Sequence, residues 1–244
     1  MTDSPANEER DAKAEKAQKA DAKKPASPTP RTKKALVFCL IGTAALLAAD
    51  LGSKAWALEE LSTERMSEPP PVCETDDHGY MRPQRLNTRE PFVILENHME
   101  LRYAENCGAA FGLLRDAPSI ARHAVFGTAA VAATIALLWM FWTGRGGGAF
   151  AWSVPFIVSG ALGNLADRLR LGYVVDFIRV YWETDLPWVG TQWPTFNIAD
   201  VTITIGIILL LVDGQKQSRA EKAAEKAEKA KGKNEPADGA KAGA

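Results

Sequence analysis

The stretch that decides the fold runs from Ala161 to Asp200 and reads ALGNLADRLRLGYVVDFIRVYWETDLPWVGTQWPTFNIAD. It joins two apolar runs, because Asp167 closes FAWSVPFIVSGALGNLA and Asp200 opens VTITIGIILLLV. Asp176 lies between them, within VVDFI. A carboxylate beside lipid is costly, so acidic residues at the ends of membrane-length segments indicate a functional site. Two carboxylates brought together there would share one proton and could activate a water molecule.

Charged and apolar residues are strongly segregated along the 244 residues. Residues 1–34 hold nine Lys/Arg and six Asp/Glu, and residues 214–244 hold eight and five. Between these tails lie four apolar runs: Ala35–Ala57, Ser119–Trp142, Ala149–Ala166 and Asn197–Val212. The fourth is shorter than the others. The sequence therefore predicts an all-α membrane protein with four transmembrane helices and two disordered tails. The C-terminal tail is expected to begin with a solvated helix fragment at AEKAAEKAEKAK.

Short strand patterns occur outside these runs. Phe92–Leu95 and Met99–Tyr103 each resemble a strand, and residues 172–182 are rich in β-branched and aromatic types but too short to span a bilayer. They predict a small extracytoplasmic β-containing region beside the helices. Residues 62–89 show little periodicity, and we interpret them as a flexible insertion in the long loop.

The basic residues beside the spans predict the orientation. They are Arg31, Lys33, Lys34, Arg145, Lys216 and Arg219, whereas loop 58–118 holds six Lys/Arg and twelve Asp/Glu. Because Lys and Arg beside spans stay in the cytoplasm, we expect cytoplasmic termini and a site at the outer face. In an oxidising compartment Cys73 and Cys107 of that loop could form a disulfide, but the sequence leaves this open.

Four motifs, taken in their order along the chain, resemble the bacterial signal peptidase II family. They are NCGAAF at 106–111, GNLADR at 163–168, VVDF at 174–177 and FNIAD at 196–200, and the first span adds DLGSK at 50–54. The resemblance implies a membrane aspartyl endopeptidase of the bacterial inner membrane. Its substrate would be a prolipoprotein, cut before a diacylglyceryl-modified cysteine. It implies contact with membrane lipid, no cofactor or metal, and no nucleic-acid partner.

The resemblance also implies the roles of individual residues. Asp176 and Asp200 would be the catalytic pair. Supporting or substrate-binding roles would fall to Asn106, Gly108, Asn164, Asp167, Arg168, Asn197, Asp50 and Lys54. The peptidase domain would cover 35–213, between tails 1–34 and 214–244.

Residue spacing adds two expectations about ion pairs. Asp50 and Lys54 are four residues apart on one helical face and can pair. Asp167 is followed directly by Arg168 at the end of a span, which suggests that these two form a structural ion pair.

Without the resemblance, the residues allow three functions. The first is a hydrolase at the membrane edge. The second is a small proton- or cation-coupled transporter that uses the carboxylates as a relay, which predicts charges near mid-membrane and internal repeats. The third is a scaffold with a basic partner for each acid, yet Asp200 has no basic neighbour in sequence. With the resemblance the hydrolase is preferred, and the transporter is the alternative.

Overall fold

The computed structural model describes residues 29–74, 82–87, 90–108, 119–182 and 191–233. Its helices are α2 (Lys33–Glu60), α3 (Ser119–Trp142), α4 (Gly148–Arg170) and α5 (Ile198–Lys233), and its strands are β1 (Phe92–Leu95), β2 (Met99–Asn106) and β3 (Val174–Val180). All four helices are long and apolar enough to cross a membrane. The predicted fold class, four transmembrane helices with a small β-containing region, is confirmed. Most of the tail expected to be disordered, residues 1–28, lies outside the described residues.

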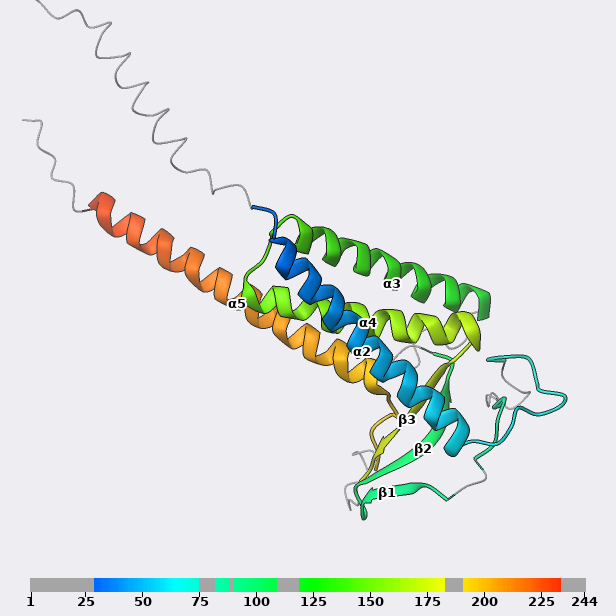
Figure 1. The fold of residues 1–244 in the computed structure, drawn as a ribbon. Helices are drawn as coiled ribbons and strands as arrows, with labels where there is room; N and C mark the ends of the chain where they lie inside the picture. The colour runs from blue at the N-terminus through cyan, green and yellow to red at the C-terminus, as the bar shows by residue number, and fades with distance from the viewer. Residues whose placement is uncertain (1–28, 75–81, 88–89, 109–118, 183–190, 234–244) are drawn as a thin grey trace, which may run out of the picture.

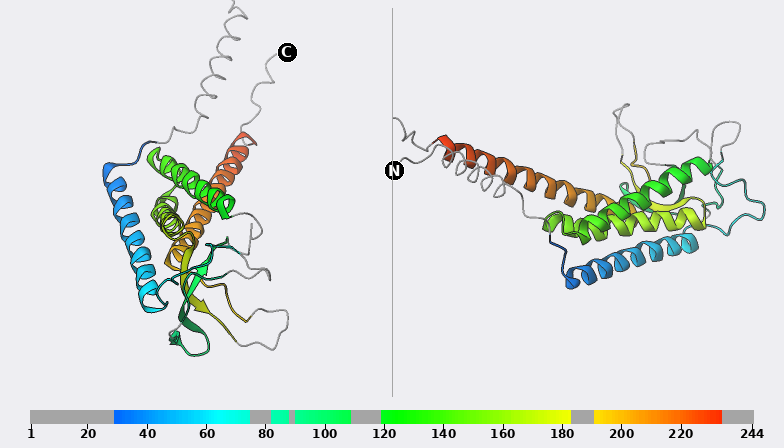
Figure 2. Two further views of the ribbon diagram at one scale, coloured as in Figure 1. Left: turned by 90° about the vertical axis from the view of Figure 1, so that its right-hand side faces the viewer. Right: turned by 90° about the horizontal axis from the view of Figure 1, so that it is seen from above.

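Helix α4 is central in the bundle, because it contacts each of the other three helices. Figures 1 and 2 show α2, α3 and α5 arranged around it. Glycines allow a close approach between α4 and α5: a Cβ at Gly160 would collide with the Ala199 carbonyl, and one at Gly206 would collide with Ile157. Small residues of this kind let helices pack tightly in lipid, where no hydrophobic effect draws them together.

The end of α4 turns directly into the sheet. Gly172 has φ +85°, a left-handed conformation that glycine adopts without steric cost. A side chain there would also collide with Val72. The third span therefore passes into β3 at Val174, which brings Asp176 close to the helix end.

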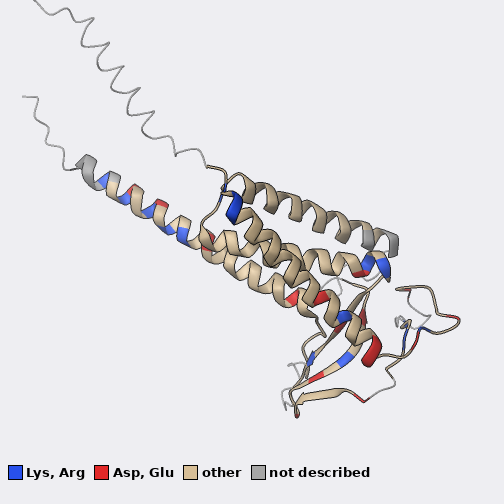
Figure 3. Ribbon diagram, in the orientation of Figure 1, with Lys and Arg blue, Asp and Glu red and all other residues tan. Residues whose placement is uncertain are grey.

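Helix α5 extends well beyond the predicted fourth span, because it continues to Lys233. The added segment contains AEKAAEKAEKAK, whose residues are strong helix formers, and Lys229 pairs with Glu225 one turn away. Figure 3 shows the charged residues along this projecting part of α5. The start of the C-terminal tail is thus a helix, and residues 234–244 lie outside the described part of the chain.

The three strands form an antiparallel sheet in the order β1-β2-β3 at one end of the bundle (Figure 1). β2 is longer than predicted and ends at Asn106, which is opposite Val174 in the register. Ala104 is opposite Asp176. The register therefore places the end of β2 next to the aspartate of β3. The sheet and α2 share a buried cluster that includes Ala57, Tyr103 and Val175.

The described parts of the insertion are packed, so the prediction of a flexible insertion is wrong for them. Cys73 and Gln84 are buried, and Thr63 N–H donates to the Leu86 carbonyl at 2.9 Å. Cys73 also forms a disulfide with Cys107, which answers the question that the sequence left open. These contacts are with residues distant in sequence, so they leave no periodic pattern.

The opposite end of the bundle joins the starts of α2 and α4 to α5. Arg31 Nη2 donates to the carbonyls of Arg145, Gly146 and Gly147 at 3.1–3.3 Å. Gly147 N–H donates to Asp213 Oδ2 of α5 at 2.9 Å. The basic flanks Arg31 and Arg145 therefore lie at the end away from the sheet.

Candidate active site

Asp200 lies in the first turn of α5, and Asn197 caps that helix. Asn197 Oδ1 accepts the Asp200 N–H at 3.0 Å, and Asp200 Oδ2 accepts the Asn197 N–H at 3.3 Å. This reciprocal pair is a capping box, which satisfies two backbone donors at the helix start. The positive end of the helix dipole also favours a carboxylate there. The other Asp200 oxygen, Oδ1, accepts from Asn164 Nδ2 of α4 at 2.9 Å.

Asp176 lies on β3 and is 1% exposed. Its Oδ1 accepts from Asn197 Nδ2 at 2.7 Å, and its Oδ2 accepts from Asn106 Nδ2 at 2.9 Å. Burial, together with the negative charge of Asp200, raises the pKa of Asp176 to about 7, against the opposing effects of the two amides and of Lys54. This carboxyl group can therefore hold a proton near neutral pH.

Lys54 of α2 is a buried cation between two carboxylates. Its Nζ lies 2.9 Å from Asp50 Oδ2 and 3.3 Å from Asp167 Oδ2, so the predicted Asp50–Lys54 pair is present. It also donates to Asn164 Oδ1 at 2.8 Å. Because that oxygen is occupied by the ammonium, the Asn164 amide nitrogen is the atom turned toward Asp200.

The two carboxylates paired with Lys54 also anchor backbone groups of the site. Asp50 Oδ1 accepts the Ala199 N–H at 2.8 Å, and Asp167 Oδ2 accepts the Val175 N–H at 3.1 Å. Each acid thus fixes the residue next to a site aspartate, Asp200 or Asp176. The Lys54 network therefore joins α2, α4, β3 and α5.

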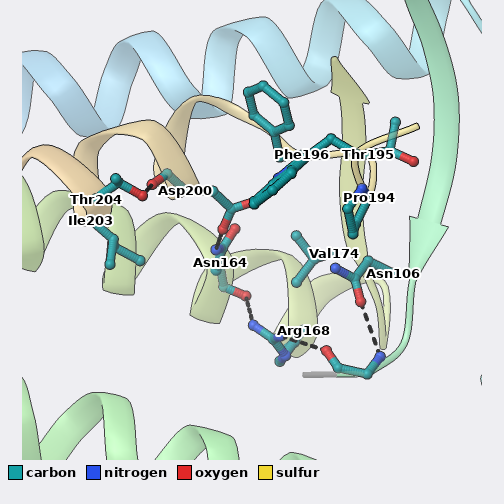
Figure 4. Close-up of a pocket in the computed structure, with 12 residues that line it drawn as sticks. Asn106, Asn164, Arg168, Val174, Pro194, Thr195, Phe196, Asp200, Ile203 and Thr204 are labelled. Carbon is teal, nitrogen blue, oxygen red and sulfur yellow. Dashed lines mark hydrogen bonds between the residues drawn. The ribbon is translucent and has the colours of Figure 1, made fainter. Parts of the chain in front are cut away.

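The expected pairing of Asp167 with Arg168 is wrong, because Asp167 forms its ion pair with Lys54. Neighbouring residues on a helix point about 100° apart, so Asp167 faces α2 while Arg168 faces another direction. Arg168 donates to the Asn164 carbonyl at 3.2 Å and to the Gly108 carbonyl at 3.4 Å (Figure 4).

A cavity of about 310 Å³ lies beside these residues. Its polar lining includes Asn106, Asn164, Arg168 and Asp200, and its apolar lining includes Val174, Trp193, Phe196 and Ile203. Figure 4 shows Asn164 and Asp200 directed toward one another at its wall. Asp200 thus faces the cavity, whereas Asp176 is buried beside it.

All the site residues predicted from the sequence belong to one connected network of hydrogen bonds and ion pairs in the structure. The links run through Asn197, Asn164, Lys54 and Arg168, and Gly108 joins through its N–H to Asn106 Oδ1 at 3.1 Å. Their roles in catalysis stay predictions. Among the described residues, no group of three or more His, Cys, Asp or Glu is placed to hold a metal ion.

Sequence reasoning missed the apolar wall of the cavity. Phe196 and Ile203 flank the capping box on α5, and Trp193 precedes it. Their position next to the NIAD motif could have indicated this role, because residues that adjoin a carboxylate at a helix start lie close to it in space. Sequence reasoning also passed over Glu105, which directly precedes Asn106.

The structure thus defines a four-helix membrane protein with a buried carboxyl beside a second, cavity-facing one. Comparison with known proteins agrees, because the model of the family described as signal peptidase (SPase) II matches residues 42–215. The chain belongs to the signal peptidase II family. The members of this family are membrane aspartyl proteases that remove signal peptides from prolipoproteins. The chain is accordingly a multi-pass protease of the bacterial inner membrane, and the transporter alternative has no support.

Individual relatives agree with this assignment. The lipoprotein signal peptidase of an Anaeromyxobacter species is 34% identical over 209 residues, which cover 82% of this chain and 93% of that protein. The one from Acinetobacter baylyi is 38% identical over 128 residues, 52% of this chain and 68% of that protein. A solved structure of a bacterial membrane enzyme, determined in meso at 2.3 Å, matches with a TM-score of 0.52 at 22% identity, covering 78% of this chain and 93% of that one. That likeness concerns the fold alone.

Proposed function

We propose that Asp176 and Asp200 are the catalytic pair of this protease and that the bond cleaved precedes a diacylglyceryl-modified cysteine. One observation carries the first part: a single residue, Asn197, hydrogen-bonds to both carboxyl groups, to Asp176 Oδ1 through its side-chain amide and to Asp200 Oδ2 through its backbone N–H. It fixes the two carboxyl groups relative to one another. A pair held in this way shares one proton, because ionising both would place two negative charges side by side.

The division of labour follows from access. Asp200 lines the cavity, so it is the group that takes a proton from an attacking water. Asp176 is buried and has a raised pKa, so it retains the proton of the pair. The water oxygen adds to the scissile carbonyl, the proton of the pair stabilises the developing oxyanion, and a proton then passes to the leaving nitrogen as the C–N bond breaks.

The other polar residues act by positioning in this proposal. Asn106, Asn164 and Asn197 orient the two carboxyls. Lys54, with Asp50 and Asp167, fixes the helix and strand ends that carry them. Arg168 and Gly108 form the cavity wall, where the substrate backbone would lie.

The cavity supports a substrate carried by lipid. Ile203 and Thr204 line it from the first turns of α5, which is a membrane-spanning helix. The opening is thus at the edge of the bilayer, with apolar groups on one side and the carboxylate on the other. A cysteine whose acyl chains stay in the membrane can reach such a site, whereas a soluble peptide has no apolar anchor there.

The orientation proposed for the chain has both termini in the cytoplasm and the site at the outer face, with residues 35–213 as the peptidase domain. The basic flanks Arg31 and Arg145 share the end away from the sheet, which supports a cytoplasmic location for that end. The Cys73–Cys107 disulfide lies at the sheet end and fits an oxidising compartment.

The decisive experiment is cleavage in detergent or proteoliposomes of a diacylglyceryl-modified prolipoprotein and of its unmodified form. The parent should cut only the modified substrate, directly before the cysteine. Asp176→Asn and Asp200→Asn should remain folded but lose cleavage, while Glu100→Gln, on β2, should keep it. Near-parent cleavage by either Asn variant would rule out the pair. Equal cleavage of both substrates would rule out the lipid requirement. Reporter fusions at residue 244 and within 82–87 test the orientation, which predicts that the two reporters lie on opposite sides of the membrane.

A further inference from the structure

The end of β2 forms part of the cavity wall. Asn106 donates to Asp176, and Gly108, two residues later, accepts a hydrogen bond from Arg168 at 3.4 Å. The position of this strand end therefore sets the geometry of a donor to the proposed catalytic pair. The two residues that flank Asn106, Glu105 and Cys107, are both bound by the described part of the insertion. We call residues 62–74 and 82–87 the anchoring loop.

Glu105 binds the anchoring loop through its carboxylate. The Gln84 N–H donates to Oε1 and Oε2 at 2.9 and 2.8 Å, and the Arg85 N–H donates to Oε1 at 2.9 Å. The Tyr103 hydroxyl also donates to Oε1 at 2.9 Å. Burial raises the pKa of Tyr103, so this hydroxyl stays protonated as a donor. Hydrogen bonds to an ionised acceptor are about twice as strong as neutral ones.

Cys107 binds the same loop covalently. Its disulfide partner, Cys73, is 4% exposed and packs in the cluster that contains Tyr103 and Tyr173. Asn106 thus lies between two anchors to one loop, a carboxylate on one side and a disulfide on the other.

The anchoring loop is itself folded, so it can serve as a support. Gln84 is 1% exposed, and its Nε2 donates to the Pro70 carbonyl at 2.7 Å while its Oε1 accepts from Arg65 at 3.1 Å. Asn87 Nδ2 donates to the Tyr103 carbonyl at 2.8 Å, which adds a second link to β2. A loop cross-linked in this way transmits a fixed position to the strand.

We propose that the anchoring loop, acting through Glu105 and the Cys73–Cys107 disulfide, positions Asn106 against Asp176, so that full protease activity requires an intact disulfide. This inference rests on the proposed catalytic pair. Glu105, Cys73 and Cys107 are positioning residues here, because they act on the reaction only through Asn106. The strength of a hydrogen bond falls steeply with misalignment, so a small shift of the strand end weakens the Asn106 donation.

The test compares Cys73→Ser/Cys107→Ser and Glu105→Gln with the parent and with Glu100→Gln. Glu100 is the matched control, because it is a buried acid on the same strand that pairs with Arg179 at 2.7 Å, away from Asn106. We expect kcat to fall by roughly ten- to a hundredfold in the loop variants, with KM changed less than about twofold. Glu100→Gln should keep the parent kcat.

The pH profile separates positioning from loss of stability. The charged groups that face Asp176 are Asp200 of α5, Lys54 of α2 and Arg168 of α4. The loop variants leave all of these in place and weaken only the Asn106 donation, which favours the ionised carboxyl. The alkaline limb of the kcat profile should therefore move to higher pH in both loop variants, as it should in Asn106→Ala.

Reduction supplies an independent test on the folded parent. Treatment with a thiol reductant should lower the parent kcat to the level of the double-serine variant and should leave that variant unchanged. Cys39, the remaining cysteine of the three, is buried in α2 and is present in both proteins, so it cannot account for a difference.

The inference would be overturned if the folded loop variants had the same kcat as the parent and the same alkaline limb in their pH profile. If the variants fail to fold in a thermal unfolding assay, full activity of the parent after verified reduction would overturn it instead. Asp176→Asn and Asp200→Asn are measured beside them. If those two retain activity, the proposed catalytic pair fails; if they are inactive while the loop variants match the parent, only this inference fails.

Discussion

Asn197 and Asp176 are joined by a hydrogen bond of 2.7 Å from the Asn197 amide to Asp176 Oδ1. The same side chain caps α5 through the Asp200 N–H. One residue therefore sets both the start of a transmembrane helix and the distance between two aspartates on different elements. The site depends on this residue for its geometry and the helix depends on it for its cap.

Asn197→Ala should lose both functions. Removal of the cap should lower the free energy of unfolding by about 0.5–2 kcal/mol. The Asp176 carboxyl, released from the Asn197 amide, should lower kcat by up to about a hundredfold. Thermal unfolding and cleavage kinetics measure the two effects separately. Asn97→Ala is the control: Asn97 has φ +61° in the β1–β2 turn, so alanine there is strained without touching the site. A normal kcat in Asn197→Ala would remove Asn197 from the proposed mechanism.

The rate of cleavage should depend on pH as a bell. At low pH both carboxyls are protonated and no base remains. At high pH the proton on Asp176 is lost, and because burial raises its pKa to about 7, the rate should fall as pH rises through about 7. Asn106→Ala should move this alkaline limb upward, because the Asn106 hydrogen bond favours the ionised form. A rate that changes in one direction only, in intact proteoliposomes, would contradict the shared proton.

Stability should also depend on pH through Asp176. Its pKa in the folded protein is about 7 against an ordinary value of 3.8, so between these pH values the folded state binds more protons than the unfolded state. The free energy of unfolding therefore falls as pH rises through this window, by on the order of 4 kcal/mol in total. Asp176→Asn removes this dependence. Thermal unfolding of parent and variant from pH 4 to 8 should give a steeper decline in the parent, and parallel curves would show that Asp176 is not perturbed.

The elements and the site residues were predictable from the sequence to different degrees. The four spans could be found because a bilayer demands long apolar runs, and α3 has the predicted bounds. The helical start of the C-terminal tail could be predicted because its Ala, Glu and Lys residues favour a helix, but apolar spacing gave no sign that it continues the fourth span without a break to Lys233. The site residues could be named because they lie in motifs that resemble those of a known family. FNIAD contains Asp200 and VVDF contains Asp176, each beside apolar residues.

Contacts between distant segments could not be predicted from spacing. Lys54 rather than Arg168 pairs with Asp167, because the choice depends on which face of α4 meets α2. The anchoring loop looked unstructured for the same reason. The loop binds Glu105 through the backbone N–H groups of Gln84 and Arg85. Almost every residue has such a group, so no pattern of side chains predicts this contact.

Lys54→Met should strongly destabilise the protein. Lys54 is 2% exposed between Asp50 and Asp167, so its removal leaves two buried carboxylates without their cation. Removing one partner of a buried ion pair lowers the free energy of unfolding by about 3–5 kcal/mol. Adding Asp167→Asn to Lys54→Met should recover part of this loss. A double-mutant cycle on thermal unfolding measures the coupling, and strictly additive effects would show that the two residues do not interact.

Gly163→Ala should disturb the site from the α4 side. A Cβ at Gly163 would overlap Asp50 Oδ2 and would lie 3.6 Å from Ala199 Cβ. Asp50 would have to move away from the Ala199 N–H that it accepts at 2.8 Å, and the start of α5 beside Asp200 would lose that anchor. We expect a lower melting temperature together with a lower kcat.

Gly52→Ala is the matched control for that substitution. Gly52 lies inside α2, and, apart from its chain neighbours and the backbone of its own helix, no atom is within 4 Å of a Cβ built there. Alanine at this position should be neutral or should stabilise the helix by about 1 kcal/mol, because glycine is the poorer helix former. Cleavage should stay at the parent rate. Equal losses in Gly163→Ala and Gly52→Ala would show that helix flexibility, rather than the approach of Asp50 to α4, is what the glycines provide.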